Sequence, residues 1–321
     1  MNITVIGCGR WGSLITWYLD HIGHRVTLYG RAASPRMQAF LSTRQNDLLT
    51  LPESVALSTA LDAALESAET VIISIGSQSL RSLLGQSELQ ALRSRTVVLC
   101  MKGLEMGTGA RLSQIAAELL HPSNTVAVWL GPGHVQEFYR GIPNCMVIDS
   151  ENEDVKRRLV QAFSSDLIRF YYGGDMIGNE VGAAAKNVVG IAAGFLDGFE
   201  MSSLKGALMS RGTREVARLI KAMGGSELSA YGLCHLGDYE ATVFSPYSHN
   251  RQFGESFVRG QDYHQLAEGY YTVKALMLLG QRYGVELPIC KAVHDILYEQ
   301  AVPRDVLAGL LRRGLTEEFY D

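Results

Sequence analysis

The sequence predicts an α/β protein in which an N-terminal, doubly wound and mainly parallel sheet is followed by an all-α C-terminal domain. Three observations carry this prediction. Short β-rich runs alternate with helical segments through the first half, a glycine-rich turn follows the first run, and helical periodicity fills the second half. At 321 residues the chain is long enough for two domains.

Seven short runs, rich in apolar and β-branched residues, form the predicted strands. They lie at residues 3–6, 25–29, 71–75, 96–100, 126–130, 145–148 and 168–172. Between some of them, residues 11–22 and 109–120 have the apolar spacing of helices. Such alternation of strands and helices is typical of a largely parallel sheet that is covered by helices.

The pattern changes at Gly173-Gly174. From residue 178 onward apolar positions recur with helical spacing, and strand-like runs are almost absent. We therefore predict one domain over residues 1–173 and a second, α-helical domain over residues 174–321. The last residues, 316–321, are acidic and aromatic, and we expect them to fray.

The composition excludes several classes of function. The net charge is −4, with 47% hydrophobic and 19% charged residues, so no basic surplus attracts nucleic acid or an anionic membrane. No secretory signal is visible at the start, and the longest nearly charge-free stretch, residues 181–196, is shorter than a membrane span and contains Lys186. We therefore expect a soluble, cytoplasmic protein with no nucleic-acid partner and no membrane insertion.

The cysteines and histidines predict no metal site. Five cysteines occur without a Cys-x-x-Cys pair, which argues against a disulfide framework and against structural zinc. His21 and His24 are close in sequence, but no carboxylate or thiolate completes a set of ligands. We expect reduced cysteines and no bound metal.

Residues 7–12 fit the pattern Gly-x-Gly-x-x-Gly, directly after the first predicted strand and at the start of the first predicted helix. Gly7 permits a tight turn, Gly9 lets the backbone approach a pyrophosphate, and Gly12 allows close packing of helix and strand. The N-terminus of the helix offers free N–H groups and a partial positive charge to that pyrophosphate. We interpret the motif as a Rossmann-like dinucleotide-binding turn, against the alternative of a glycine turn without a ligand.

The end of the second predicted strand indicates which dinucleotide is bound. A site that prefers NAD usually has a carboxylate there, which accepts hydrogen bonds from the ribose hydroxyls. This strand ends at Tyr29-Gly30-Arg31, without a carboxylate. A guanidinium can bind a 2′-phosphate through a fork of donors. The sequence therefore favours NADP(H), and a site that takes NAD(H) as well is the alternative if Arg31 is a solvated loop residue.

Residues 180–197 predict a helix that is buried almost all round. One stripe of this helix collects Val181, Ala184, Ala185, Val188, Ala192 and Phe195, and the opposite face carries Ala183, Lys186, Gly190 and Ala193. Glycine inside a helix is unfavourable by up to about 1 kcal/mol relative to alanine. Gly182, Gly190 and Gly194 therefore predict the close approach of another element or of a ligand.

Lys186 is the one ammonium on this helix. A lysine that is held among small, buried residues tends to have a lowered pKa, which suits a general acid for a carbonyl that becomes an alcohol. The structural alternative is that the Lys186 side chain reaches out to solvent or pairs with a carboxylate such as Glu180. The residues by themselves leave both interpretations open.

A series of motifs runs through the rest of the chain. They are Lys-Gly-Leu-Glu at 102–105, Gly-Pro at 131–132, the lysine helix at 180–188, Gly-Asp at 237–238, and the segments 245–254 and 268–275. In this order and spacing, together with the glycine turn, the chain resembles the bacterial-type NAD(P)-dependent glycerol-3-phosphate dehydrogenase family over nearly its whole length. The resemblance implies reduction of dihydroxyacetone phosphate to sn-glycerol 3-phosphate, and the reverse, in phospholipid biosynthesis by a homodimer.

The resemblance also implies roles for single residues. Lys186 matches the catalytic lysine, which donates a proton in reduction and accepts one in oxidation, and Lys102 matches a lysine that helps polarise the substrate carbonyl. Asp238 completes the catalytic set. Residues matched to the cofactor are Gly7, Gly9, Arg10, Trp11, Gly12, Arg31, Lys102, Val135, His249 and Glu268. Residues matched to a small, phosphorylated three-carbon substrate are Lys102, Gly131, Gly133, Lys186, Asp238, Ser248, His249 and Asn250.

Each of these roles agrees with the chemistry. A hydride that arrives from a nicotinamide places negative charge on the carbonyl oxygen, and a nearby ammonium stabilises that charge and supplies the proton. Asp238 is suited to orient Lys186 and hold it protonated. For Asp238 and Asn250 the alternative is a capped turn.

Three departures from the family pattern fall on the substrate side. His249 replaces the arginine that serves the phosphate, and histidine cannot make the same bidentate contact. Gly133 replaces a serine, and the turn at residues 200–203 is one residue shorter. Arg251 and Lys205 are the candidates for a replacement phosphate contact.

Two other functions therefore stand beside the leading hypothesis. One is a related dehydrogenase that acts on another small hydroxy or carbonyl compound, phosphorylated or not. The other is a non-catalytic protein that binds NADP(H) as a sensor. The presence of Lys186, Lys102 and Asp238 together argues against the sensor, which has no need of that set.

Overall fold

Contacts within the chain divide it into two compact units. The computed structural model describes residues 1–312 and 318. Unit 1 comprises Met1–Met101 and Leu112–Met176, and unit 2 comprises Lys102–Arg111 and Ile177–Asp321. The segment Lys102–Arg111 thus belongs to unit 2, an excursion that the alternation of strands and helices does not indicate.

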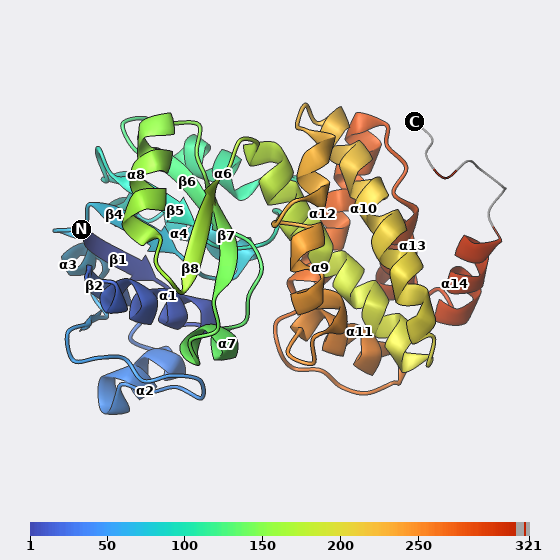
Figure 1. Cartoon of the computed structure of the whole chain (residues 1–321), viewed down its shortest axis with the longest axis horizontal. Helices are drawn as coiled ribbons and strands as arrows, with labels where there is room; N and C mark the ends of the chain where they lie inside the picture. Colours follow the sequence, from blue (N-terminus) through green and yellow to red (C-terminus); the bar gives the residue numbers. More distant parts are fainter. Residues whose placement is uncertain (313–317, 319–321) are drawn as a thin grey trace. The chain divides into compact units, whose positions relative to one another are not determined.

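Unit 1 is built around one mainly parallel sheet, shown in Figure 1. Within the described residues its strands are β1 (Asn2–Ile6), β2 (Arg25–Tyr29), β3 (Ala56–Ser58), β4 (Thr70–Ile73), β5 (Thr96–Leu99), β6 (Thr125–Leu130), β7 (Asn144–Asp149) and β8 (Ile168–Tyr172). Their order is β3-β2-β1-β4-β5-β6-β7-β8, and every pair of neighbours is parallel except β6 and β7. The predicted doubly wound sheet is confirmed.

Each predicted run overlaps a strand, but β3 was not predicted. It has three residues and pairs only with β2, at the edge of the sheet. Such a short edge strand has too few positions to show a period of two along the sequence. The longer strands β4 and β5 are buried at every position, as expected for the centre of a sheet that is covered on both faces.

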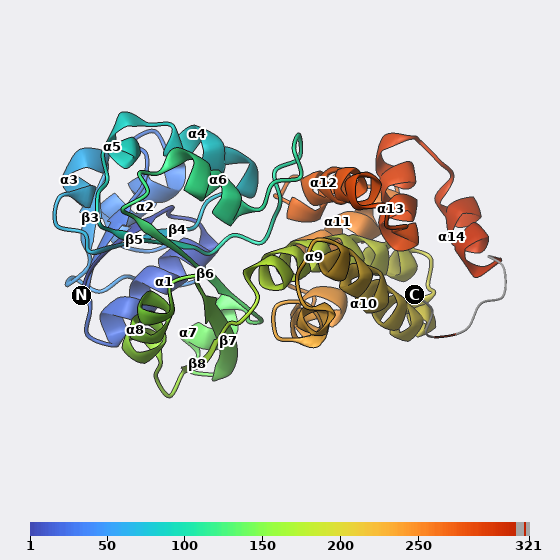
Figure 2. The ribbon, with the colours of Figure 1, turned by 90° about the horizontal axis from the view of Figure 1, so that it is seen from above.

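Helices cover both faces of the sheet of unit 1. They are α1 (Arg10–His21), α2 (Pro35–Thr43), α3 (Leu61–Leu65), α4 (Leu80–Leu84), α5 (Ser87–Gln90), α6 (Leu112–Leu119), α7 (Val135–Tyr139) and α8 (Glu153–Phe163). Figure 2 shows α1 and α8 on one side of the sheet and α4, α5 and α6 on the other. The core between them is apolar and includes the fully buried Trp129, whose ring lies 4.9 Å from that of Phe170.

Unit 2 is helical, as predicted. Its longer helices within the described residues are α9 (Met176–Gly198), α10 (Lys205–Ala222), α11 (His249–Val258), α12 (Glu268–Tyr283), α13 (Pro288–Tyr298) and α14 (Pro303–Leu311). Every residue of α9 from Glu180 to Leu196 is buried. The predicted buried helix therefore lies in the core of this unit.

The glycines of α9 are positions of close approach, as the sequence predicts. A Cβ on Gly194 would lie 2.1 Å from the carbonyl oxygen of Arg251, and one on Gly190 would lie 2.7 Å from Cγ2 of Thr242. On the facing helix α11, a Cβ on Gly254 would lie 2.2 Å from the carbonyl oxygen of Ile191. The two helices therefore touch backbone to backbone, which any larger residue would prevent.

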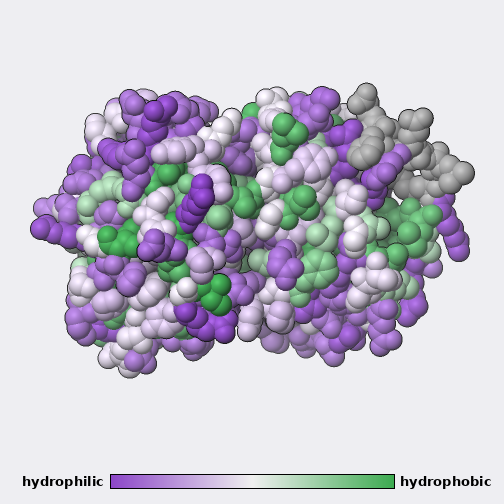
Figure 3. All heavy atoms as spheres, in the orientation of Figure 1, coloured by the Kyte–Doolittle hydropathy of each residue, from purple (hydrophilic) through white to green (hydrophobic). Residues whose placement is uncertain are grey.

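The face drawn in Figure 3 is mostly hydrophilic, with apolar residues scattered over it. Among the described residues no helix has both the length and the apolar character needed to cross a membrane. The cysteines are free, and the part of the chain that the structure describes holds no group of three or more potential metal ligands.

Candidate active site

The glycine-rich turn between β1 and α1 is a cradle that a side chain would fill. Gly7 has a φ of +118°, and a Cβ on it would lie 2.1 Å from the carbonyl oxygen of Ser74. A Cβ on Gly12 would lie 1.9 Å from the carbonyl oxygen of Gly7. Gly9 is the N-cap of α1 and leaves the first turn without a side-chain cap. The N–H groups of this turn are therefore suited to bind a pyrophosphate.

Three arginines belong to the elements next to this turn. Arg31 follows β2 and is exposed, at the strand end where a dinucleotide would place its adenosine ribose. Arg36, which the sequence analysis missed, lies in the first turn of α2, and its Nη1 is 3.7 Å from the position of a Cβ on Gly9. The signal that could have found it is the Ser-Pro helix start at residues 34–35, which fixes α2 just after the strand. Arg10 begins α1 and is half-buried.

The second glycine-rich loop, after β6, explains one departure from the family pattern. Gly131 and Gly133 have φ values of +128° and +142°. A Cβ on Gly133 would lie 2.2 Å from the ring of Phe138, so a serine cannot occupy this position beside that phenylalanine. The Phe138 ring also lies 6.0 Å from the ring of Trp11, and Val135 begins α7 with its side chain buried. Glycine at position 133 therefore leaves room for the Phe138 ring.

In unit 2, two lysines converge on one buried carboxylate. Lys186 Nζ lies 3.0 Å and Lys102 Nζ 2.7 Å from the same oxygen, Oδ2 of Asp238. Lys186 also donates a hydrogen bond to Oγ1 of Thr242, at 2.6 Å. Asp238 and Lys186 are 1% and 6% exposed. The structure therefore brings together the three residues predicted to be catalytic.

Burial lowers the pKa of Lys186 to about 8. The negative charge of Asp238 opposes this fall, and the positive charge of Lys102 adds to it. Glu180, the alternative partner of Lys186, instead pairs with Arg111 at 2.7 Å. Lys186 is thus an ammonium that can lose its proton near physiological pH, which is the property that a general acid needs.

The second carboxylate oxygen of Asp238, Oδ1, differs from the first in its hydrogen bonding. Among the described residues Oδ1 is buried and has no hydrogen-bond partner. A buried carboxylate oxygen without a donor is unfavourable by about 1–3 kcal/mol. Such an atom is more typical of a site that receives a donor from a ligand than of a purely structural ion pair.

Two further residues of this site were missed by the sequence analysis. The Thr242 hydroxyl accepts a hydrogen bond from Lys186 and donates one to the backbone oxygen of Asp238 at 2.7 Å. It therefore contacts both members of the Lys186–Asp238 ion pair. Asn187 donates to the backbone oxygen of Lys102 at 2.8 Å. Asn187 follows Lys186 directly and Thr242 stands one helical turn after Asp238, so spacing alone could have suggested both.

The start of α11 holds the remaining substrate residues predicted from the sequence. Asn250 donates to Oδ1 of Asn187 at 3.0 Å and accepts from the backbone N–H of Gly269 at 2.9 Å, next to Glu268 at the start of α12. Ser248 is the N-cap of α11, and its hydroxyl accepts from the backbone of Arg251. His249 Nδ1 lies 2.6 Å from the hydroxyl of Tyr263.

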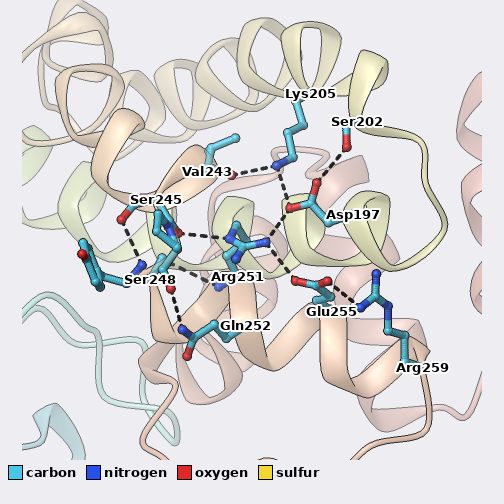
Figure 4. Close-up of polar contacts among 12 residues, drawn as sticks. Asp197, Ser202, Lys205, Val243, Ser245, Ser248, Arg251, Gln252, Glu255 and Arg259 are labelled. Carbon is cyan, nitrogen blue, oxygen red and sulfur yellow. Dashed lines mark hydrogen bonds and ion pairs between the residues drawn. The ribbon is translucent and has the colours of Figure 1, made fainter.

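The two cations that could replace the missing arginine have other partners, as Figure 4 shows. Arg251 Nη1 lies 2.8 Å from Oδ2 of Asp197 and 2.9 Å from Oε2 of Glu255. Lys205 Nζ lies 2.7 Å from the same oxygen of Asp197 and donates to the backbone oxygen of Val243 at 3.0 Å. Both cations are therefore neutralised inside the helical unit.

The predicted site residues divide between the two units. Unit 1 contains Gly7, Gly9, Arg10, Trp11, Gly12, Arg31, Gly131, Gly133 and Val135, and unit 2 contains Lys102, Lys186, Asp238, Ser248, His249, Asn250 and Glu268. In unit 2 a continuous hydrogen-bond network joins Lys186, Asp238 and Lys102 to Asn187 and Asn250.

Comparison with known proteins matches both halves of the chain to one family. The family model described as NAD-dependent glycerol-3-phosphate dehydrogenase N-terminus matches residues 2–156, and the model for its C-terminus matches residues 175–308. A glycerol-3-phosphate dehydrogenase [NAD(P)+] of a Thermoanaerobacter species is 32% identical over 331 residues, which cover 100% of this chain and 99% of the relative. The protein of the same name from Nitrosomonas europaea is 35% identical over 325 residues, covering 98% of each.

A solved structure shows the same likeness in three dimensions. The crystal structure of glycerol-3-phosphate dehydrogenase from Coxiella burnetii superposes with a TM-score of 0.89 at 27% sequence identity. The superposition covers 97% of this chain and 99% of that one. The similarity therefore extends over both units and not only over the dinucleotide-binding fold.

Proposed function

The chain belongs to the NAD-dependent glycerol-3-phosphate dehydrogenase family, and from this premise we propose that it reduces dihydroxyacetone phosphate to sn-glycerol 3-phosphate with NADPH, and catalyses the reverse reaction. One observation supports this proposal above the others. Lys186 is buried, has a lowered pKa, and lies 3.0 Å from the carboxylate of Asp238. Burial and pairing are shared with Lys205, and the lowered pKa is the property that suits the Lys186 ammonium to transfer its proton to an alkoxide.

The residues of unit 2 supply the acid chemistry. Bound NADPH supplies the hydride. As the carbonyl oxygen gains negative charge, Lys186 donates its proton to that oxygen, and Lys102 stabilises the charge as a second cation. Asp238 holds both ammonium groups, and Thr242 orients Lys186 through its hydroxyl. In oxidation Lys186 acts in the neutral form and takes the proton from the hydroxyl.

The residues of unit 1 would hold the cofactor. The turn at Gly7, Gly9 and Gly12 would bind the pyrophosphate through backbone N–H groups, because no Cβ obstructs the approach. Arg31 would bind the 2′-phosphate of NADPH, and Arg36 adds a second cation beside the turn. NADPH is therefore the preferred cofactor, with NADH accepted more weakly.

A second candidate function keeps the chemistry and changes the substrate. It is the oxidoreduction of another small hydroxy or carbonyl compound. The ion pairs that hold Arg251 and Lys205, together with His249 in place of arginine, favour it, because they leave the phosphate of the substrate with fewer fixed cations.

The deciding experiment is an assay at 340 nm with purified protein, dihydroxyacetone phosphate, and either NADPH or NADH. Rapid oxidation of NADPH, absent in the Lys186→Met variant, is the expected result. Tight binding of NADPH without oxidation, combined with turnover of a different small carbonyl compound, would favour the second candidate. Binding of NADPH without turnover of any such compound would favour the non-catalytic NADP(H) sensor.

The remaining predictions concern the protein as a whole. We propose a cytoplasmic homodimer in which residues 1–173 form the dinucleotide-binding domain and residues 174–321 the substrate domain. Mass photometry of the purified chain would measure the oligomeric state, and a species of about 70 kDa is expected from a monomer mass of 35.2 kDa.

A further inference from the structure

A fully buried histidine lies beneath the lysine–aspartate pair. His235 is 0% exposed, and no step of the proposed reaction uses it. Its Nδ1 lies 2.8 Å from the backbone oxygen of Gly182, and its Nε2 lies 2.8 Å from the hydroxyl of Tyr239. Because a carbonyl oxygen only accepts, Nδ1 carries the proton, and Nε2 accepts from Tyr239. Both ring nitrogens are therefore satisfied.

The first of these bonds reaches the turn of α9 that carries Lys186. In an α-helix the carbonyl of one residue accepts from the N–H four residues later, which for Gly182 is the N–H of Lys186. His235 thus donates to the carbonyl that already binds the Lys186 backbone. A Cβ on Gly182 would lie 3.0 Å from the Cβ of His235, so the glycine leaves room for the imidazole to approach.

The second bond, between His235 Nε2 and the Tyr239 hydroxyl, joins the two residues that flank the short helical turn carrying Asp238. This turn, Leu236–Asp238, lies between His235 and Tyr239 in sequence. The Tyr239 hydroxyl also lies 3.4 Å from Oγ1 of Thr213 on α10. The turn is therefore held against α9 by one flanking residue and against α10 by the other.

We propose that His235 is a positioning residue that sets the distance between the Asp238 carboxylate and the Lys186 ammonium and so acts on proton transfer through that pair. This inference rests on the proposed role of Lys186 as the general acid. The imidazole is well suited to the task because it adds no charge beside the pair. Burial lowers the pKa of His235 to about 4, and the groups that face it are Lys186, Asp238 and Tyr239.

The experiment is a double-mutant cycle measured on kcat and KM with dihydroxyacetone phosphate and NADPH. His235→Phe keeps the ring but removes both hydrogen bonds, and it is combined with Asp238→Asn. In the wild-type background we expect His235→Phe to lower kcat about tenfold with KM unchanged. In the Asp238→Asn background the same change should lower kcat less than twofold, because the pair it positions is already broken.

Two milder variants guard against a loss of folding. His235→Asn keeps a donor for Gly182, and Tyr239→Phe removes the bonds to Nε2 and to Thr213 but keeps the bond from Nδ1 to Gly182, so each should give a smaller loss of kcat than His235→Phe. Equal losses in both backgrounds, or a change confined to thermal stability, would overturn the positioning role while the proposed function stands. An inactive wild type would overturn the proposed function first, and the inference with it.

Discussion

Helix α9 carries two ion clusters, and they differ in how completely their carboxylate oxygens are hydrogen-bonded. Around Lys186, two ammonium groups share one oxygen of Asp238, and its other oxygen has no partner among the described residues. Around Asp197, at the end of the same helix, Lys205 and Arg251 share one oxygen, and Glu255 supplies a second carboxylate. Arg259 also contacts Glu255, at 2.8 Å, so each cluster has one more cation than carboxylates, but in the second cluster every carboxylate oxygen has a donor.

This difference distinguishes a cluster suited to catalysis, around Asp238, from a cluster that stabilises the fold, around Asp197. The cluster around Asp197 satisfies its members, and three hydrogen bonds that include those from Lys205 and Arg251 lower the pKa of Asp197 against the opposing effect of burial. In the cluster around Asp238 the burial of Lys186 dominates and lowers the pKa of that lysine to about 8. An incompletely satisfied cluster is ready to exchange a proton with a ligand, whereas a satisfied one stabilises the fold.

The largest effect should come from exchanging one lysine in each cluster for methionine. Lys186→Met should lower kcat by about 10³-fold or more, since it removes the general acid, and should leave NADPH binding and stability nearly intact. Lys205→Met is the matched control and should keep kcat while lowering the free energy of unfolding by about 1–2 kcal/mol. Turnover at 340 nm and urea unfolding measure the two effects. Wild-type turnover in Lys186→Met would contradict the assignment of Lys186 as the general acid.

The next effect concerns the pH profile. Lys186 donates a proton in reduction, so kcat for reduction should fall as pH rises through about 8, and kcat for oxidation should rise over the same range. Asp238→Asn removes a charge that raises the Lys186 pKa. It should therefore move the fall of kcat in the reduction profile to lower pH and reduce kcat about 100-fold.

The comparison for this prediction is Asp197→Asn, which should leave the pH profile where it is. Rates are measured from pH 6 to 10 in both directions. If kcat for reduction falls at the same pH in Asp238→Asn as in the wild type, a group other than Lys186 titrates in the reaction.

The contrast between the clusters also shows what the sequence can predict. The Lys186 helix was predictable because its glycines and its single charge stand out against an apolar run. The partners of Lys186 were predictable only through family resemblance, since Asp238 lies 52 positions away along the chain. His235 gave no signal at all, because its role depends on a tertiary contact with α9, whereas the position of Thr242 one helical turn after Asp238 was the only hint of its role.

In unit 1 the limits are of another kind. The strands of the sheet were predictable from their apolar runs, and only the three-residue β3 was too short to detect. The excursion of Lys102–Arg111 into unit 2 was not predictable, because the segment has neither helical nor strand periodicity. Arg36 was missed because its proximity to Gly9 depends on how α2 folds back.

A smaller effect should come from Arg31, a cation that is exposed rather than held in a cluster. Arg31→Asp should weaken NADPH binding about 30-fold, through the loss of charge-assisted hydrogen bonds and the added repulsion. NADH binding should change less than threefold. Fluorescence titration of both cofactors measures this, and Arg36→Gln is the matched variant, expected to weaken both cofactors alike because Arg36 lies beside the pyrophosphate turn. An equal loss of both cofactors in Arg31→Asp would contradict the 2′-phosphate role.

The smallest effect tests whether the cluster around Asp197 is closed to the substrate. His249→Arg should lower the KM for dihydroxyacetone phosphate about fivefold, because a guanidinium binds phosphate with two donors where imidazole offers one. Arg251→Lys keeps a cation between Asp197 and Glu255 and should leave that KM unchanged, since the carboxylates and not the substrate hold this side chain. The reverse outcome, a raised KM in Arg251→Lys and none of the gain in His249→Arg, would mean that Arg251 leaves Asp197 to bind the phosphate. The two clusters would then be parts of one site.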